Sequence, residues 1–581
     1  MDGIGRLFMG YSDRPIRMLC SSKIFGRRPD GFSCTPPTDF SSTSHSSSLA
    51  GGMGTCGNGR RFMGIDHYRE FTRGKTTPLW IDTADEAEHP ALPCTMSFDV
   101  AVVGGGIAGL TAAVLLKHSG AKVAVLEAGR IARGVTAHST AKITSGHDVI
   151  YQDLINRFSE EKARQYAEAN QGAVEFIAAF ADERGVSCDF RRSFACTYTC
   201  EDQNLERIQK EVEIAGDLRL PVTYTESLPL PFPVKGAICY ENQAYFHPRK
   251  YLLSMAEIIP GGGSRIFENT RVGDVEEGRP CRVITERGVV KADQVIVATH
   301  FPILNRGLFF AKMTPFRSYL TAMSLEQEAP EGMYISLDAP FHTIRKHRTD
   351  NGEDYLLLGG EDHEVGHEGN TAERYRRIET FARDHFRIRD ILYRWSTQDN
   401  SPVDQVPFIG RHSLLSRRIY VATGFQGWGM TNGTVAGVLL SDMIAGRKNP
   451  WSGVFDPNRF TPFISRKFFS QNIHIAEMFV TDRVTGRAEK SLSDLEPGEG
   501  GIVEQNGKEF AASRDEEGTT RVLSPSCTHM GCKVTWNNAE ESWDCPCHGS
   551  RFDRDGKVIQ APAVKDLIAE ESKQRAVSSK K

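Results

Sequence analysis

The chain has 581 residues, with 70 basic and 74 acidic side chains and a formal net charge of −4 at pH 7. A charge this close to balance does not favour a nucleic acid or another polyanion as the partner. The length allows two or three domains, each with its own core. The most apolar stretch, Val100–Leu116, is interrupted by four glycines, so we expect no integral membrane segment.

The first part of the chain, residues 1–75, differs from the rest in composition. It is rich in serine, glycine and arginine and has no glutamate before Glu70. This predicts a disordered tail. The alternatives are a transit peptide and a true start at Met63. We expect a cytoplasmic protein, or an organelle protein if the tail is a transit peptide. Nine of the thirteen cysteines lie outside residues 473–570 and are expected to be free thiols.

A nucleotide-binding pattern follows the tail. A buried-strand pattern, Ser97–Val103, is followed by the glycine-rich turn Gly104–Gly109, a helical pattern at Leu110–Ser119 and a second strand at Lys122–Leu126. Together they predict a βαβ unit that binds a dinucleotide. A βαβ unit without a ligand is the alternative, and the acidic residue that ends the second strand, Glu127, argues against it.

Single residues of this unit have separate expected roles. Gly104 would make the tight turn, Gly106 would let the backbone approach the pyrophosphate, and Gly109 would let helix and strand pack closely. The phosphates would lie at the helix N-terminus, and Glu127 would accept hydrogen bonds from the ribose. The expected nucleotide contacts here are Gly104, Gly106, Ile107, Ala108, Gly109, Glu127 and Ala128.

A second glycine-rich turn lies far along the chain, in Tyr420–Gly433, after a strand pattern and before a helical one. At this point the chain resembles the D-amino-acid oxidase (DAO) superfamily of FAD-dependent oxidoreductases, over about residues 97–460. The resemblance implies that FAD is bound and that amides of this turn stabilise negative charge on the reduced flavin. The expected contacts are Gly424, Gly427, Trp428, Gly429, Met430 and Thr431.

The same resemblance assigns the segments between the two turns. Val272 would contact the adenine, and residues 148–247 and 308–399 would form an α+β substrate domain that includes a predicted helix at Glu160–Arg184. Gly261–Gly263 lacks a flanking strand and helix and is interpreted as a loop. The chain therefore offers one nucleotide fingerprint, which argues against reductases that bind NAD(P)H in a second Rossmann unit.

The stretch Gly134–Thr144 resembles a group of bacterial Rieske flavoproteins in particular. Thr136, Ser139 and Thr140 suit phosphate or ribityl groups, with helix capping as the alternative role. His138 would hydrogen-bond the flavin. The alternative is a covalent bond to the flavin, which a histidine at about this place makes in dimethylglycine-type dehydrogenases.

Four residues are candidate substrate contacts. Arg345 could hold a carboxylate with two hydrogen bonds, and Tyr319 could contact the substrate directly. Tyr334 and Trp428 could line the pocket. The alternatives are a surface ion pair for the arginine and core packing for Tyr334 and Trp428.

The C-terminal part carries a metal-binding pattern. After a linker at residues 456–472, the region 473–570 contains Cys527-x-His529 and Cys545-x-x-His548. Two thiolates and two imidazoles can hold a [2Fe-2S] cluster with both histidines on one iron. Zinc also accepts two sulfurs and two nitrogens, but zinc sites usually pair cysteine with cysteine and histidine with histidine.

This segment closely resembles the Rieske family of cytochrome bc complexes. The resemblance implies that Cys527, His529, Cys545 and His548 bind the cluster and that Cys532 and Cys547 form a disulfide. It also implies that Ser550 donates to a cluster sulfur. Phe552 stands where high-potential members have tyrosine, so we expect a reduction potential at the lower side of the bc-type range. Trp536 and Trp543 are expected to pack the small β domain.

The predicted fold is an α/β Rossmann-type FAD domain with an α+β substrate domain, followed by a small all-β Rieske domain. The leading hypothesis is an enzyme that oxidises an amine or amino acid by hydride transfer to FAD and passes electrons singly through the cluster to an external acceptor. The alternatives are an electron-transfer component without its own substrate and a redox sensor. A Rieske oxygenase is least favoured, because no site of two histidines and one carboxylate is evident.

Overall fold

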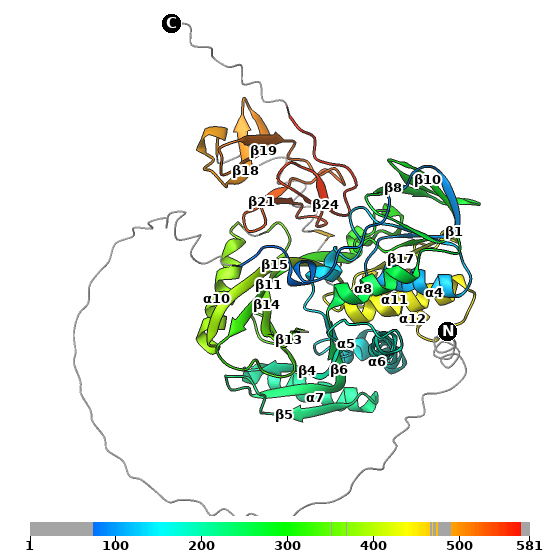
Figure 1. Cartoon of the computed structure of the whole chain (residues 1–581). Helices are drawn as coiled ribbons and strands as arrows, with labels where there is room; N and C mark the ends of the chain where they lie inside the picture. Colours follow the sequence, from blue (N-terminus) through cyan, green and yellow to red (C-terminus); the bar gives the residue numbers. More distant parts are fainter. Residues whose placement is uncertain are drawn as a thin grey trace, which may run out of the picture. The chain divides into compact units, whose positions relative to one another are not determined.

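The computed structural model describes residues 74–349, 351–367, 369–464, 468, 472, 473 and 490–570. The predicted N-terminal tail, apart from its last two residues, lies outside these ranges, as does part of the predicted linker. The described residues form two large mixed regions and a smaller C-terminal β region (Figure 1).

The first region is built on a sheet with the strand order β16-β17-β10-β1-β2-β7, beside which β8 and β9 pair with β10. Its central strands are parallel. Parallel strands covered on both faces are apolar throughout, and all four residues of β2 are buried. The strands are β1 (Met96–Val103), β2 (Val123–Leu126), β7 (Arg265–Phe267), β8 (Val272–Glu276), β9 (Cys281–Thr285), β10 (Gly288–Val297), β16 (Phe408–Arg411) and β17 (Ile419–Thr423).

Two helices that follow the glycine-rich turns pack against each other: α4 (Ile107–His118) and α11 (Gly429–Ile444). They approach closely at Gly437, where an added Cβ would lie 2.5 Å from the side chain of Thr111. Further helices of this region are α3 (Leu79–Asp82), α8 (Pro248–Ile258) and α12 (Ser452–Phe455). The βαβ unit is therefore present as predicted, with its helix beginning three residues earlier than the pattern suggested.

The second region is built on a larger mixed sheet with the order β15-β11-β14-β13-β12-β4-β6-β3, and β5 pairs with β6. Its strands are β3 (Lys142–Ile143), β4 (Arg191–Thr199), β5 (Val222–Thr225), β6 (Gly236–Tyr245), β11 (Met313–Leu325), β12 (Met333–Ser336), β13 (His342–Arg348), β14 (Asp354–Glu364) and β15 (Ile388–Pro402). Strands from both predicted substrate segments meet in this sheet, because β12 pairs with β4.

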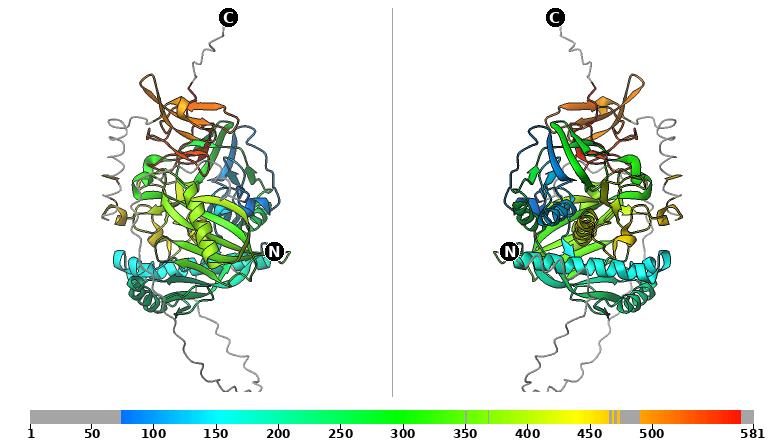
Figure 2. Two further views of the ribbon diagram at one scale, coloured as in Figure 1. Left: turned by 90° about the vertical axis from the view of Figure 1, so that its left-hand side faces the viewer. Right: turned by 90° about the vertical axis from the view of Figure 1, so that its right-hand side faces the viewer.

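Helices of the second region are α5 (Tyr151–Arg157), α6 (Glu160–Glu183), α7 (Leu205–Asp217), α9 (Phe309–Lys312) and α10 (Ala372–His385). The predicted long helix is confirmed as α6, whose N-cap Ser159 accepts a hydrogen bond from Lys162 N. Figure 2 shows α6 as the long cyan helix; it packs against α11 and α12. Short 3₁₀ turns lie at η1 (Val135–His138), η2 (Asp202–Asn204), η3 (Asn305–Gly307) and η4 (Thr461–Ile464).

The expectation of free thiols outside the C-terminal region was wrong for two cysteines. Cys196 on β4 and Cys239 on β6 form a disulfide. They are direct partners in the antiparallel register, so their side chains project to the same face of the sheet. Among the described residues, Cys94, Cys188, Cys200 and Cys281 form no disulfide.

The C-terminal region consists of two small antiparallel sheets, β18-β19-β20 and β21-β22-β23-β24. The elements are η5 (Leu492–Asp494), β18 (Gly500–Gln505), β19 (Lys508–Arg514), β20 (Thr520–Leu523), β21 (Thr535–Asn537), β22 (Ser542–Asp544), β23 (Arg551–Phe552) and β24 (Val558–Gln560). The rings of Trp536 and Trp543 lie 4.9 Å apart, and Trp543 is fully buried. Their predicted packing role is confirmed.

Candidate functional site

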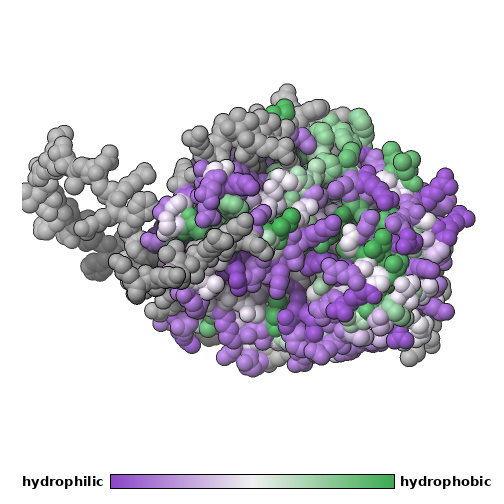
Figure 3. All heavy atoms as spheres, turned by 90° about the horizontal axis from the view of Figure 1, so that it is seen from above, coloured by the Kyte–Doolittle hydropathy of each residue, from purple (hydrophilic) through white to green (hydrophobic). Residues whose placement is uncertain are grey.

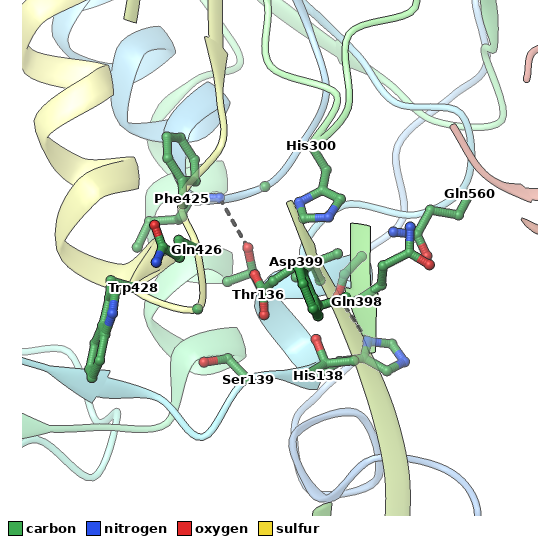
Figure 4. Close-up of a pocket in the computed structure, with 18 of the residues that line it drawn as sticks. Thr136, His138, Ser139, His300, Gln398, Asp399, Phe425, Gln426, Trp428 and Gln560 are labelled. Carbon is green, nitrogen blue, oxygen red and sulfur yellow. Dashed lines mark hydrogen bonds between the residues drawn. The ribbon is translucent and has the colours of Figure 1, made fainter. Parts of the chain in front are cut away.

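A cavity of about 1020 Å³ runs along the first glycine-rich turn and into the second region. Most of the predicted FAD contacts line it (Figure 4). These are Gly104, Gly106, Ile107, Ala108, Glu127, Ala128, Thr136, His138, Ser139, Val272, Gly427, Trp428, Gly429 and Met430. Residues that are far apart in the sequence are thus brought to one space large enough for a dinucleotide.

The glycines of the first turn lie in different surroundings. An added Cβ at Gly109 would lie 2.0 Å from Gly104 O, and one at Gly104, where φ is +111°, would lie 2.3 Å from Ala298 O. At Gly106 the nearest atom would be Thr136 Oγ1, at 3.3 Å. The first two are needed for packing, whereas Gly106 leaves room on the cavity side.

Glu127 is held by the turn itself. Its Oε2 accepts a hydrogen bond from Gly105 N at 2.8 Å, and its Oε1 accepts one from Gly129 N at 2.9 Å. Burial raises the pKa of Glu127, and these two backbone donors lower it. The remaining lone pairs of the carboxylate are positioned to accept hydroxyl groups.

The predicted hydroxyl and imidazole contacts lie opposite the second turn (Figure 4). Thr136 Oγ1 accepts a hydrogen bond from Ile107 N at the start of α4, at 3.4 Å. The His138 ring has Nδ1 2.9 Å from Gly134 O, so Nδ1 carries the hydrogen. Desolvation lowers the pKa of His138, which favours the neutral imidazole.

The second turn brings an aromatic wall to the cavity. Trp428 stacks on His147 with 4.7 Å between ring centroids. His147 in turn lies 3.0 Å from Thr431 Oγ1 and 2.7 Å from Tyr166 Oη. Gly424, where φ is +76°, and Thr431 support the turn from behind and do not line the cavity.

Two of the candidate substrate contacts, Arg345 and Tyr319, do not line the cavity. Arg345 is fully buried away from the cavity, bonded to Thr140 O at 2.6 Å and lying over the ring of Tyr245. Tyr319 is also fully buried and pairs with His363. Side chains alternate between the two faces of a strand: Phe316, Ser318 and Leu320 of β11 face the cavity, so Tyr319 faces away.

Tyr334 also lies outside the cavity wall, and its hydroxyl donates to Glu331 O. Of the four candidates, Trp428 lines the cavity. The prediction could not separate the two faces of these strands, because their register depends on long-range pairing.

A group of ionisable residues that no sequence pattern indicated also lines the cavity. Burial lowers the pKa of Lys142 to about 7 and raises the pKa of Asp148 to about 6. Lys142 Nζ donates to Tyr334 O at 2.8 Å and to Thr343 Oγ1. Asp148 has a left-handed backbone, with φ of +57°, which is uncommon and concentrates at functional sites. Arg207 and Asp362 also line the cavity and interact electrostatically with Asp148.

The second candidate centre lies in the C-terminal region. Cys527 and Cys545 are buried free thiols. A hydrogen bond from Cys545 lowers the pKa of Cys527 to about 7, as suits a metal-binding thiolate. Each begins a similar loop: Cys527 N donates to Cys532 O and Cys545 N to Ser550 O, both at 2.8 Å.

The two histidines complete this centre. The rings of His529 and His548 lie 5.1 Å apart, and the Nδ1 atoms of both are buried without a hydrogen-bond partner. Burial lowers the pKa of His529 to about 4 and of His548 to about 3, so both rings are neutral, as metal ligands require. Two thiols and two free imidazole nitrogens thus fit the group that the sequence suggested.

A disulfide joins the two loops. Cys532 and Cys547 are bonded to each other, and the Cys545 sulfur lies within 4.8 Å of both. Ser550 Oγ accepts a hydrogen bond from Ala563 N at 3.0 Å, and Phe552 is fully buried.

The histidine edge of this centre faces the rest of the protein. His529 Nε2 lies 2.9 Å from Asn305 Oδ1, and the ring of His548 lies 5.6 Å from that of Phe310. Because Asn305 Oδ1 is an acceptor, Nε2 carries the hydrogen and Nδ1 is left free. Elsewhere in the interface, Thr371 Oγ1 bonds with Asn537 Oδ1 at 2.6 Å.

Comparison with known protein families gives two matches. Residues 99–443 match the DAO family, described as FAD dependent oxidoreductase, and residues 488–571 match the Rieske [2Fe-2S] domain. The chain belongs to the DAO family of FAD-dependent oxidoreductases. It carries a Rieske domain at its C-terminus, and its cofactors are FAD and a [2Fe-2S] cluster.

Individual relatives match different shares of the chain. YhfW of Bacillus subtilis strain 168, described as a Rieske 2Fe-2S iron-sulfur protein, is 38% identical over 503 residues, which cover 86% of this chain and 98% of YhfW. The gamma-glutamylputrescine oxidoreductase of Escherichia coli K12 is 23% identical and covers 61% of this chain and 84% of its own length. The crystal structure of glycine oxidase from Geobacillus kaustophilus shares the fold, with a TM-score of 0.53 at 15% identity, covering 62% of this chain and 99% of the oxidase.

Among the described helices none is both long and apolar enough to cross a lipid bilayer. The face seen from above in Figure 3 is mainly hydrophilic, with apolar side chains in smaller groups between the polar ones.

Proposed function

We propose that this protein oxidises a small amine or amino acid and releases the electrons one at a time through its cluster to an external acceptor. One observation carries the proposal. The cavity that contains the nucleotide-binding turn is also lined by residues of the Rieske domain, among them Arg551 and Gln560. The domain that carries the one-electron site therefore forms part of the lining of the cavity for the two-electron cofactor.

We assign the cofactor sites by residue. FAD would be held by the cavity-lining residues of the two glycine-rich turns, with Val272 at the adenine and Thr136, His138 and Ser139 between the pyrophosphate and the flavin. The cluster would be held by Cys527, His529, Cys545 and His548, with the disulfide of Cys532 and Cys547 holding the two loops together. A hydrogen-bonding role for His138 remains our assignment; flavin released into the supernatant by acid precipitation would exclude a covalent bond.

The ionisable residues around Asp148 suit a substrate with both charges. Lys142 and Arg207 could hold a carboxylate, and Asp148 and Asp362 could hold an ammonium group. Two features support an amine or amino acid. These four residues line one space, and the related gamma-glutamylputrescine oxidoreductase is named for an amine substrate.

The residues of this chain bind and orient the substrate, which is often sufficient for flavin oxidation of a C–H bond beside an amine. When bound, FAD accepts two electrons from such a substrate and the cluster carries one at a time. Trp428 walls the cavity beside His147 and excludes water from that side. Asp148 is ionised above about pH 6, so it can take the charge of an ammonium group.

The test is anaerobic reduction of the purified holoprotein with a panel of amines and amino acids. Flavin absorbance and the electron paramagnetic resonance (EPR) signal of the reduced cluster are followed together. We expect the flavin to bleach and the cluster signal to appear with the same substrate. A flavin that bleaches while the cluster stays oxidised would refute the relay. Reduction by a protein donor alone, with every small molecule inactive, would instead support an electron-transfer component.

A further inference from the structure

Segments of both domains lie between the flavin cavity and the cluster loops. From the Rieske side come β24 and the segment after it, Val558–Ala561, Ala563 and Val564. This segment also contacts the cluster loop, because Ala563 N donates to Ser550 Oγ at 3.0 Å. From the flavin side comes Gln398 on β15, which lines the cavity and lies beside Gln560 and His138 in Figure 4.

Gln398 makes a direct bond to the cluster loop. Its Nε2 donates to Gly549 O at 2.8 Å, and Gly549 is the neighbour of the expected ligand His548. Its Oε1 accepts from Arg317 Nη2 at 2.9 Å. The side chain is 2% exposed, so it is buried with both ends of its amide paired.

The cluster loop packs so closely against β11 and β15 at Gly549 that no side chain fits at this position. An added Cβ on Gly549 would lie 2.4 Å from Gln398 Nε2 and 2.7 Å from Pro315 Cβ, and its φ of +74° also favours glycine. The cluster loop is therefore in direct contact with β11 and β15.

Buried charges hold this contact in place. The Arg317 side chain is fully buried, with Nε 3.5 Å from Asp544 Oδ2, and Arg551 Nε lies 3.0 Å from Asp544 Oδ1. Arg317 belongs to the flavin side, and Asp544 directly precedes the ligand Cys545. Breaking such a pair would leave a buried charge uncompensated, so the docked position is favoured over release of the domain.

We propose that Gln398 is a positioning residue that holds the cluster loop against the flavin cavity, so that electrons cross between the centres in this docked arrangement. The step is a one-electron transfer. One electron leaves the reduced flavin and one ferric iron becomes ferrous, with no bond made or broken. This inference rests on the proposed relay and adds the place where the relay crosses between domains.

The variant Gln398→Met tests it in the full-length holoprotein. Methionine is similar in length but cannot donate to Gly549 O or accept from Arg317. After flash photoreduction of the flavin, we expect the cluster signal to appear more slowly than in the wild type. Flavin content and the EPR line shape should be retained. The midpoint potentials of both centres are measured in parallel, so that a change in driving force is separated from a change in contact.

Thr371→Val provides the matched control, because Thr371 also bonds across the interface, to Asn537 and Asn538, but does not line the cavity. This variant should transfer electrons at the wild-type rate. If the methionine variant loses a cofactor, Gln398→Glu makes the same comparison, since it keeps the bond from Arg317 but replaces the donor to Gly549 with a negatively charged acceptor. Equal rates in wild type and Gln398 variants at equal potentials would overturn the inference. No transfer in the wild type would overturn the relay as well.

Discussion

Gly106 and Gly109 differ in what surrounds them. We therefore expect a larger residue at Gly106 to weaken FAD binding and one at Gly109 to prevent folding. We expect Gly106→Val to fold and to bind FAD about ten- to a hundredfold more weakly, because overpacking costs about 1–3 kcal/mol and its open side faces the cavity. Gly109→Val should fail to fold, since a Cβ there would lie 2.0 Å from Gly104 O. The flavin-to-protein ratio after gel filtration, with far-ultraviolet circular dichroism, distinguishes the two. A Gly106→Val protein with full flavin would refute the assigned site.

The ionisable residues Asp148 and Lys142 predict that kcat/KM depends on pH. Asp148, with its pKa raised to about 6, must be ionised to hold an ammonium group; Lys142, with its pKa lowered to about 7, must be protonated to hold a carboxylate. We therefore expect kcat/KM for an amino acid to rise through about pH 6 and fall through about pH 7. The two groups interact, so these values belong to the pair.

Single variants assign the two sides of that profile. Asp148→Asn should remove the rise on the acid side, and Lys142→Met should remove the fall on the alkaline side. Each is measured as kcat/KM across pH with the flavin content held constant. An unchanged profile in both variants would show that these residues do not contact the substrate.

At the scale of elements, the packing of α4 on α11 determines where the first turn lies. We expect Gly437→Ala to destabilise the protein by about 1–3 kcal/mol, because the new Cβ would lie 2.5 Å from Thr111. Gly216→Ala on α7 is the control: no atom lies within 4 Å of its added Cβ, and the change should be neutral or stabilising by up to about 1 kcal/mol. Apparent unfolding temperatures compare them, and equal destabilisation by both would contradict the packing argument.

The elements that were predicted correctly have sequence patterns that lie within short segments of the chain. The βαβ unit, α6 and the two cysteine–histidine loops each have a pattern within about thirty residues. The misplaced residues depend on distant partners. Tyr319 lies on the face of β11 that is turned away from the cavity, because of the way β11 pairs with β14 and β15. Cys196 meets Cys239 because β4 pairs with β6. No local pattern records which strand a residue will pair with.

At the scale of the whole molecule, the sequence indicated two cofactor domains but not their docking. The interface depends on Asp544, whose pKa is lowered to about 2 by Arg551 and Arg317 in spite of its burial. We expect Asp544→Asn to lower the stability of the docked Rieske domain by about 3–5 kcal/mol, because it leaves the two buried arginines without a counter-charge. Loss of the cluster's visible circular dichroism on heating measures this.

The exposed pair Arg521–Asp555, at 56% and 53% side-chain exposure, provides the control. Asp555→Asn should change stability by about 0–1 kcal/mol. A similar small effect of both changes would mean that the interface pair does not hold the domain. Because the pKa of Asp544 is lowered in the folded protein, its ionised form stabilises the docked domain. This stabilisation is complete above about pH 4 and is lost as the pH falls through about 2.

The position of His529 and His548 against Asn305 and Phe310 has a kinetic consequence. The chain's own flavin domain contacts both rings, and His548 is buried, so the first transfer of the proposed relay would be a unimolecular event. Its rate should be independent of protein concentration, and dilution should slow only the later encounter with the acceptor. That acceptor must approach another face of the Rieske domain. In the proposed relay, electrons would therefore enter and leave the Rieske domain at different faces.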